Sequence, residues 1–80
     1  MDYEIEYVVN VDLGNRTEFV GFRSYFAARM RAREYFYRIN GVVKVTITDA
    51  HTGECYWYLD GEEIWENNPD PNLIPIVEVR

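Results

Sequence analysis

The chain has 80 residues, and its 14 Asp or Glu against 8 Lys or Arg give a formal net charge of −6. Hydrophobic residues make up 48% of it and aromatic residues 16%, which excludes intrinsic disorder. No apolar run approaches the roughly 18 residues of a membrane span. A chain of this length holds one domain, because a second would have no core of its own.

The first part of the chain predicts a hairpin followed by a helix. Side chains alternate between apolar and polar over residues 3–11, as in a half-buried strand, and residues 17–22 predict the returning strand after a turn. Residues 23–39 hold neither Gly nor Pro and are rich in helix formers, so they predict a helix. We expect Ser24 to cap the N-terminus of this helix.

The second part of the chain predicts three further strands. The helix is expected to end at Asn40-Gly41, because both residues tolerate a left-handed backbone. Residues 42–48 and 54–59 then predict two strands joined by a turn, and 62–65 predict a short further strand after a tight turn.

This order of elements predicts an α+β fold of two layers, in which one helix packs on one face of an antiparallel β-sheet. We assign residues 1–66 to this single domain. Residues 67–80 form a Pro-rich C-terminal extension, because three prolines within seven residues exclude a helix or a central strand. Within the extension, residues 76–79 form either an extra edge strand or a tail.

The predicted helix has two apolar stripes, although a helix on a small sheet normally buries only one. The predicted core stripe contains Tyr25, Ala28, Ala32, Tyr35, Phe36 and Ile39. A second stripe contains Phe26, Met30, Arg33 and Tyr37, and Arg29 separates the two. The second stripe either completes the margin of the core or forms a contact surface. Aromatic, Met and Arg side chains are enriched at interfaces, so the sharper hypothesis is that it binds a partner or forms a homodimer.

The strand at residues 54–59 also has aromatic side chains on both faces. Alternation places Cys55, Trp57 and Leu59 on the core side, and it places Tyr56 and Tyr58 on the face that the helix leaves open. These two tyrosines either pack against neighbouring strands or offer a platform for a partner.

Charge is segregated along the chain. Residues 23–44 carry six Arg or Lys against one Glu, whereas residues 45–79 carry eight acids and no Lys or Arg. We name four of these acids as partner-binding candidates together with the tyrosines: Asp60, Glu62, Glu63 and Glu66. The acidic segment favours a partner protein with a basic surface, because complementary charge speeds association. It also suggests mimicry of nucleic acid, whereas ordinary solvation of turns is the simpler interpretation.

No pattern predicts catalysis, a metal or a cofactor. The acids around Gly61 lie at a predicted hairpin tip and do not have the spacing of a calcium loop. His51 and Cys55 are close in sequence, but we expect Cys55 to face the core, which argues against a nucleophile–base pair. The phosphate-binding and nucleophile-elbow glycine motifs are missing from the sequence. We therefore expect a protein that is not an enzyme.

The cysteine content, the start of the chain and the charge balance restrict the expected compartment and the expected class of partner. Cys55 is the single cysteine, and the acidic start of the chain lacks the basic region of a secretory signal, so we expect a cytoplasmic protein. A net negative charge argues against nucleic acid as the partner. The arginine-rich helix nevertheless leaves open a small homodimeric nucleic-acid-binding or regulatory factor.

The segments AARMRAREYF, VVKVTITDAHTGE and YWYLDGEEIW follow one another in the order helix, strand and turn, then strand, turn and strand. This layout over residues 3–66 resembles the very small acidic α+β proteins that bacteriophages use to inhibit host proteins, including some anti-CRISPR proteins. The resemblance lies in the layout, so it assigns no functional residue. It implies a non-enzymatic inhibitor, encoded by a phage or mobile element, that occludes a protein in the host cytoplasm. The alternatives are a nucleic-acid mimic and the homodimeric factor above.

Overall fold

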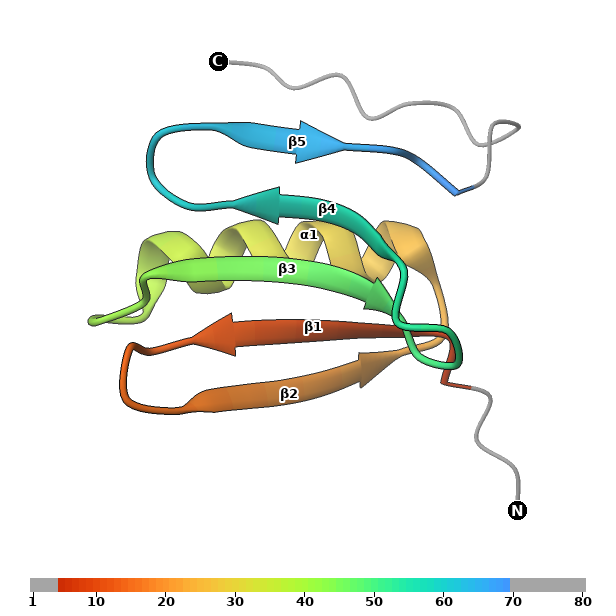
Figure 1. Ribbon diagram of the computed structural model, residues 1–80, viewed down its shortest axis with the longest axis horizontal. Coiled ribbons are helices and arrows are strands. Elements are labelled where there is room, and N and C mark those ends of the chain that lie inside the picture. Colours follow the sequence, from red (N-terminus) through yellow and green to blue (C-terminus); the bar gives the residue numbers. More distant parts are fainter. Residues whose placement is uncertain (1–4, 70–80) are drawn as a thin grey trace.

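Five antiparallel strands and one helix form the computed structural model, which describes residues 5–69 (Figure 1). The elements are β1 (Tyr7–Asp12), β2 (Thr17–Phe22), α1 (Tyr25–Arg38), β3 (Lys44–Asp49), β4 (Cys55–Leu59) and β5 (Ile64–Glu66). The sheet has the order β2-β1-β3-β4-β5, and the helix packs on one face. The predicted two-layer α+β fold is therefore confirmed. The candidate edge strand at 76–79 lies outside the described residues.

The helix begins and ends close to the predicted positions. The Ser24 side chain accepts a hydrogen bond from the Ala27 N–H at 3.2 Å, so Ser24 is the N-cap that the sequence predicts. At the other end, the Ile39 N–H donates to the Tyr35 carbonyl while the Ile39 backbone is already extended. Ile39 was expected in the core, but its side chain is 42% exposed because it follows the last helical turn.

The core lies between the helix and the middle of the sheet. Its buried hydrophobic residues are Val9, Val11, Tyr25, Ala28, Ala32, Val45, Ile47, Tyr56, Trp57 and Leu59. Ala28 and Ala32 have no exposed surface, and their small side chains let the helix lie close to β1 and β3. The period-two pattern of the strands therefore places its apolar side chains against the helix, as predicted.

A β-bulge between β3 and β4 changes the direction of one predicted side chain. Ile47 pairs with Trp57, but Thr48 pairs with Cys55, so Tyr56 is an extra residue in β4. The simple alternation that placed Tyr56 on the open face is therefore wrong. Tyr56 is buried in the core, and Cys55, expected in the core, instead pairs with Thr48, which lies on the face away from the helix.

Tyr56 joins two other tyrosines at the start of the helix. Its ring lies edge-on to that of Tyr7 at 5.8 Å between centroids and to that of Tyr25 at 6.2 Å. Tyr7 and Tyr25 are themselves 5.6 Å apart, so the three rings form one packed cluster. Edge-to-face packing of this kind stabilises buried aromatic side chains. Tyr56 therefore serves the core and is withdrawn from the candidate binding residues.

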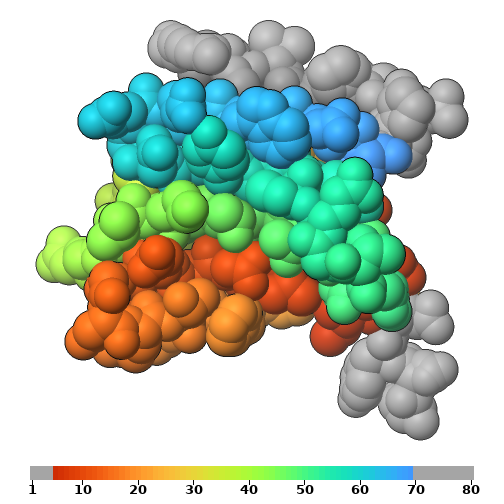
Figure 2. Space-filling view, viewed as in Figure 1, coloured from red at the N-terminus to blue at the C-terminus, as the bar shows by residue number. Residues whose placement is uncertain are grey.

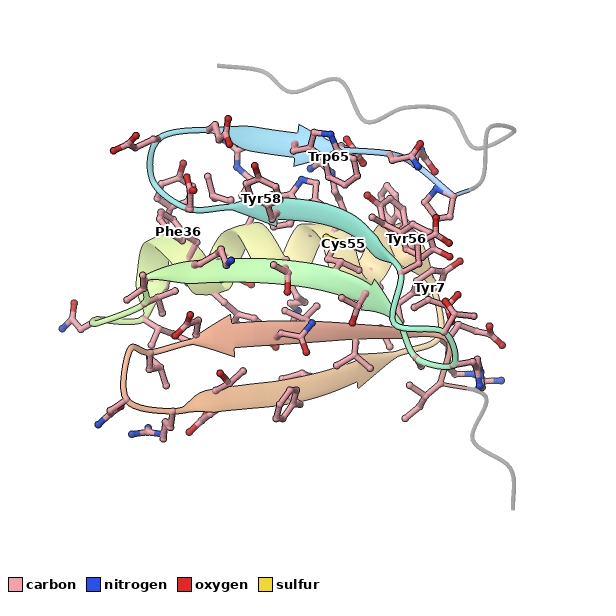
Figure 3. The ribbon with its side chains drawn as sticks, viewed as in Figure 1. Tyr7, Phe36, Cys55, Tyr56, Tyr58 and Trp65 are labelled. Atoms are coloured by element: carbon pink, nitrogen blue, oxygen red, sulfur yellow. The ribbon has the colours of Figure 1, made fainter. Side chains whose placement is uncertain are left out.

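The opposite face of the sheet, which is turned towards the viewer in Figure 2, carries polar side chains at its centre and aromatic side chains near its edges. The Asn10 amide donates to the hydroxyls of Thr46 at 3.0 Å and Thr48 at 3.1 Å. On β4 and β5, Tyr58 and Trp65 are cross-strand neighbours whose rings stack at 6.1 Å (Figure 3). This face follows the usual pattern of an antiparallel sheet with one solvated side, and Tyr58 lies on it as predicted.

One ion pair joins the helix to the edge strand β5. Arg29 is only 7% exposed, and its Nε and Nη2 atoms donate to the two carboxylate oxygens of Glu66 at 3.1 and 3.2 Å. The Tyr25 hydroxyl donates to the same carboxylate at 2.6 Å, and the Arg29 guanidinium lies 5.6 Å from the ring centroid of Trp57. The expectation that Glu66 binds a partner is replaced by this internal role, because its carboxylate is already held on two sides.

We predict that Glu66→Ala destabilises the fold strongly, because it leaves Arg29 buried without its carboxylate. Removing one partner of a well-buried pair costs about 3–5 kcal/mol, and the partial exposure of Glu66 places the expected loss at about 2–4 kcal/mol. Urea unfolding followed by tryptophan fluorescence measures this loss.

Glu62→Ala is the matched control, because it removes an exposed carboxylate two residues before β5. We expect it to change the free energy of unfolding by less than about 0.5 kcal/mol. Equal stability of the two variants would show that the ion pair does not hold β5.

Candidate protein-binding surface

The second apolar stripe of the helix faces outward. Phe26, Met30 and Tyr37 are 48%, 55% and 63% exposed, as expected for side chains that the sheet does not cover. The Arg33 guanidinium lies 5.7 Å from the ring centroid of Tyr37, so it adds a cation–π contact to this stripe. The structure thus places all four residues of the predicted stripe on the helix, although Phe26 lies in the first turn, far from Tyr37.

Tyr37 is the point where this stripe meets the β4–β5 hairpin. It lines one hollow together with Met30, Arg31, Arg33, Glu34 and Arg38. It also lines a second hollow together with Leu59, Gly61, Glu62, Glu63 and Ile64. We call the combined area the helix–hairpin surface and define it by Met30, Arg31, Arg33, Tyr37, Arg38, Glu62 and Ile64. The sequence predicted its helix part and its hairpin part as separate features, and the fold brings them together.

Ile64 is the member of this surface that sequence reasoning missed. It is 45% exposed and pairs with Leu59, whose side chain faces the helix. Its direction follows from Glu66, because residues two apart in a strand point to the same face, and Glu66 reaches Arg29 on the helix. The sequence does indicate that Ile64 and Glu66 lie on the same face of their strand. It does not indicate which face of the sheet the helix covers, and that knowledge is needed to see that both residues face the helix.

The two ends of the helix–hairpin surface carry opposite charge. On the helix, Arg31 and Arg38 share a single acid, Glu34, at 4.0 and 3.5 Å. Their side chains are 59% and 75% exposed, so these ion pairs leave much of both guanidinium groups in solvent. On the hairpin, Glu62 is exposed. The surface therefore runs from a cationic flank through an apolar centre at Tyr37 to an anionic flank.

The hairpin turn itself is held by Asp60. Its carboxylate accepts the backbone N–H groups of Glu62 at 3.0 Å and Glu63 at 3.1 Å, and these bonds lower the pKa of Asp60. Gly61 supplies the positive φ of +96° that the turn requires. The carboxylate of Asp60, which was predicted as a binding residue, is therefore used to hold the turn. Asp60 positions the hairpin tip that carries Glu62.

Tyr58, the remaining predicted residue, lies on the opposite face of the sheet. Its hydroxyl donates to the Glu63 carboxylate, and this bond raises the pKa of Tyr58. Tyr58 therefore holds the Glu63 carboxylate on the face away from the helix, where the alternation of the strand also directs it. The structure brings Met30, Arg33, Tyr37 and Glu62 together, whereas Phe26, Tyr56, Tyr58, Glu63 and Glu66 lie elsewhere or act internally.

The β3–β4 turn shows the same use of an aspartate. The Asp49 carboxylate accepts the backbone N–H groups of Thr52 and His51 at 2.9 and 2.7 Å, which lowers the pKa of Asp49. Its second oxygen accepts the Tyr56 hydroxyl at 2.9 Å. That bond, together with burial of the ring, raises the pKa of Tyr56 to about 12. These hydrogen bonds attach the β3–β4 turn to the tyrosine cluster, so Asp49 and Tyr56 have a structural role.

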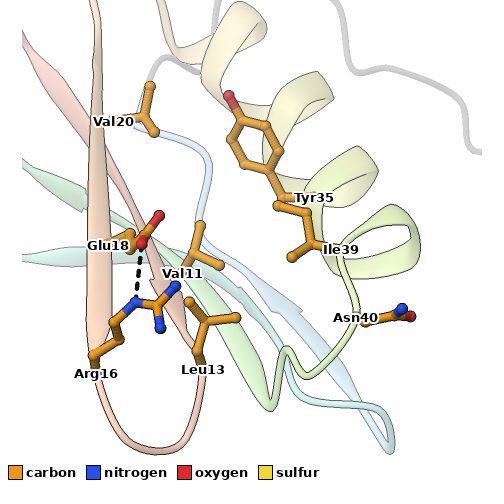
Figure 4. A pocket seen from close by; sticks show the side chains of 8 residues that line it. All are labelled: Val11, Leu13, Arg16, Glu18, Val20, Tyr35, Ile39 and Asn40. Atoms are coloured by element: carbon orange, nitrogen blue, oxygen red, sulfur yellow. Dashed lines mark hydrogen bonds and ion pairs between the residues drawn. The ribbon is translucent and has the colours of Figure 1, made fainter.

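A further hollow lies between β2 and the end of the helix (Figure 4). Its apolar lining comes from Val11, Leu13, Val20, Tyr35 and Ile39. At its side, Arg16 and Glu18 form an ion pair of 3.0 Å in which both side chains are more than half exposed. Since these two charged groups bind each other, the hollow presents an apolar lining rather than a set of reactive groups.

Comparison with known proteins adds no relative: no protein family matches the chain, and no curated protein or solved structure matches it. Over residues 5–69, the helix is too short and too polar to cross a membrane. Within the same range, no three His, Cys, Asp or Glu side chains gather in a way that could hold a metal ion. The helix–hairpin surface is thus the feature on which a functional conclusion rests.

We predict a specific alkaline signature for Tyr56. Its pKa is raised from 10.0 to about 12 in the folded protein, so its contribution to stability is complete below pH 10 and is lost as the pH rises to 12. Tyr56→Phe lacks this contribution. The free energy of unfolding should therefore fall more steeply between pH 10 and 12 in the unsubstituted protein than in the variant.

The measurement is a series of urea unfolding curves at fixed pH, with both proteins treated identically. Tyr25 and Tyr58 titrate in both proteins and therefore cancel in the comparison. Parallel stability curves over this range would contradict the bond between Tyr56 and Asp49.

Proposed function

We propose that this protein is a non-enzymatic protein-binding module, and that it is a phage or mobile-element inhibitor that occludes a host protein through its helix–hairpin surface. The observation that carries the proposal is the outward stripe of the helix. Met30 and Tyr37 are both more than half exposed, although the other side of the same helix already covers the sheet. Ile64 continues this apolar area onto the hairpin.

The composition of the surface suits protein recognition. Single exposed apolar side chains are common and need no explanation, but here three of them border the shared hollows around Tyr37. Covering one such side chain is worth about 1.5–3 kcal/mol when burial is complete. Tyr, Met and Arg are also the residue types enriched in interface centres. A partner that covered Tyr37 would therefore gain affinity from residues that contribute little to the core.

The charges define what kind of partner fits. Glu62 favours a basic surface on the partner, as the sequence suggests, because it is exposed and close to the apolar centre. Arg31 and Arg38 on the opposite flank favour an acidic group beside it. Such a pattern fixes orientation and speeds association more than it adds affinity.

The same contacts weaken the two alternatives. Nucleic-acid mimicry needs a row of available carboxylates, but Asp49 and Asp60 accept backbone N–H groups and Glu66 is paired with Arg29. A nucleic-acid-binding helix needs a high local positive charge. Arg29 is internal and paired with Glu66, and Glu34 offsets part of the charge of Arg31 and Arg38.

We predict that Met30→Asp combined with Tyr37→Asp lowers partner capture by at least about tenfold, because a charge in a desolvated contact costs more than 1.4 kcal/mol. The measurement is a pull-down of tagged protein from bacterial lysate, with the amount of any near-stoichiometric partner quantified.

Phe19→Asp is the matched control. Phe19 is 67% exposed on β2, and its side chain lies on the sheet face away from the helix. It should capture the partner as well as the unsubstituted protein, and circular dichroism should show that all the proteins are folded. If the double substitution and the control behave alike, the helix–hairpin surface is not the binding site.

A further inference from the structure

The helix–hairpin surface is complementary to itself. Tyr37 borders both hollows, with Arg31, Arg33 and Arg38 around one and Glu62 and Glu63 around the other. A surface with a cationic flank, an apolar centre and an anionic flank matches a copy of itself turned by 180° about an axis through the centre. A two-fold interface uses the same patch on both subunits, so this is the arrangement that closes without further growth.

Such a pairing would satisfy each part of the surface. The Tyr37 rings and the Met30 side chains of two copies would cover each other at the axis. The arginine flank of each copy would then face Glu62 of the other copy. Every contact is made twice, so a modest local gain is doubled.

We infer that the free protein pairs with a second copy through the helix–hairpin surface, and that this pairing competes with binding of the partner protein. The inference rests on the proposed function in one respect, because both events use the same surface. Self-pairing adds regulation: a concentrated protein hides its binding surface, and dilution or a tighter partner exposes it.

The net charge keeps the pairing reversible. Each copy carries a formal charge of −6, so two copies repel one another at long range even though their flanks attract at contact. The structure therefore leads us to expect a dimer that forms and dissociates with concentration, rather than an obligate one.

A charge-exchange experiment tests this directly. One variant carries Arg31→Glu and Arg38→Glu, so both of its flanks are acidic. The other carries Glu62→Arg, so both of its flanks are basic. In a two-fold pair each variant would place like charges against each other, and like-charge contacts disfavour association strongly. When the two variants are mixed, every acidic flank meets a basic flank.

The measurement is sedimentation velocity over a range of concentrations, with the two variants alone and in an equimolar mixture. We expect the unsubstituted protein to dimerise with concentration, each variant alone to bind itself at least about tenfold more weakly, and the mixture to recover dimer. The recovery also shows that both variants are folded. The basic-flank variant is a demanding case, because it has a smaller net charge and yet should not pair with itself.

Two results would overturn the inference: an unsubstituted protein that stays monomeric at every concentration, or variants that each dimerise as well as it does. These results are separable from the fate of the proposed function. A monomer whose capture of a lysate protein is abolished by the Met30 and Tyr37 substitutions overturns the inference and leaves the function standing. An unsubstituted protein that dimerises as expected but captures no lysate protein at any concentration supports the inference and removes the function.

Discussion

The ion pair between Arg29 and Glu66 connects the helix to the outermost strand, and the binding surface depends on it. Strand β5 is three residues long and has β4 as its neighbour in the described sheet, so backbone pairing alone holds it weakly. The two-pronged contact from Arg29, with the Tyr25 hydroxyl on the same carboxylate, fixes which face Glu66 takes. That choice turns Ile64 towards the helix and brings Glu62 beside Tyr37. A core contact thus determines an external surface.

The two faces of the sheet carry different kinds of side chain. The helix side is buried and holds the apolar core residues Trp57, Ile47, Val9, Val11 and Val45. The other side carries hydrogen-bonded polar side chains, such as Asn10 with Thr46 and Thr48. On the open face, Tyr58 and Trp65 stack on each other across strands, whereas Phe19 pairs with Asn10 and is exposed by itself. On the outer helix stripe, Met30 and Tyr37 are exposed together and border the same hollow, and Tyr37 also borders Ile64 of the hairpin. This grouping directs the functional proposal to the helix rather than to the open face.

Much of the fold follows from local sequence, and the failures come from particular long-range or one-residue effects. The Ser24 cap and the β-branched alternation of β1 and β3 could be predicted because each depends on residues close in the chain. Tyr56 could not, because one extra residue in β4 reverses the direction of its side chain. Arg29 lies between the two stripes of the helix, and its partner Glu66 is 37 residues away, so nothing local reveals that both are internal. The outward stripe was visible in the sequence, whereas its junction with the hairpin required the sheet order.

Nuclear magnetic resonance of the ¹⁵N-labelled protein at increasing concentration tests the central claim that the helix–hairpin surface is complementary to itself and pairs two copies of this protein. The account predicts progressive shifts of backbone signals over residues 30–38 and 60–64, with unchanged signals for Asn10 and Phe19 on the opposite face. Shifts confined to β2 and the open face, or no shift at any concentration, would contradict it.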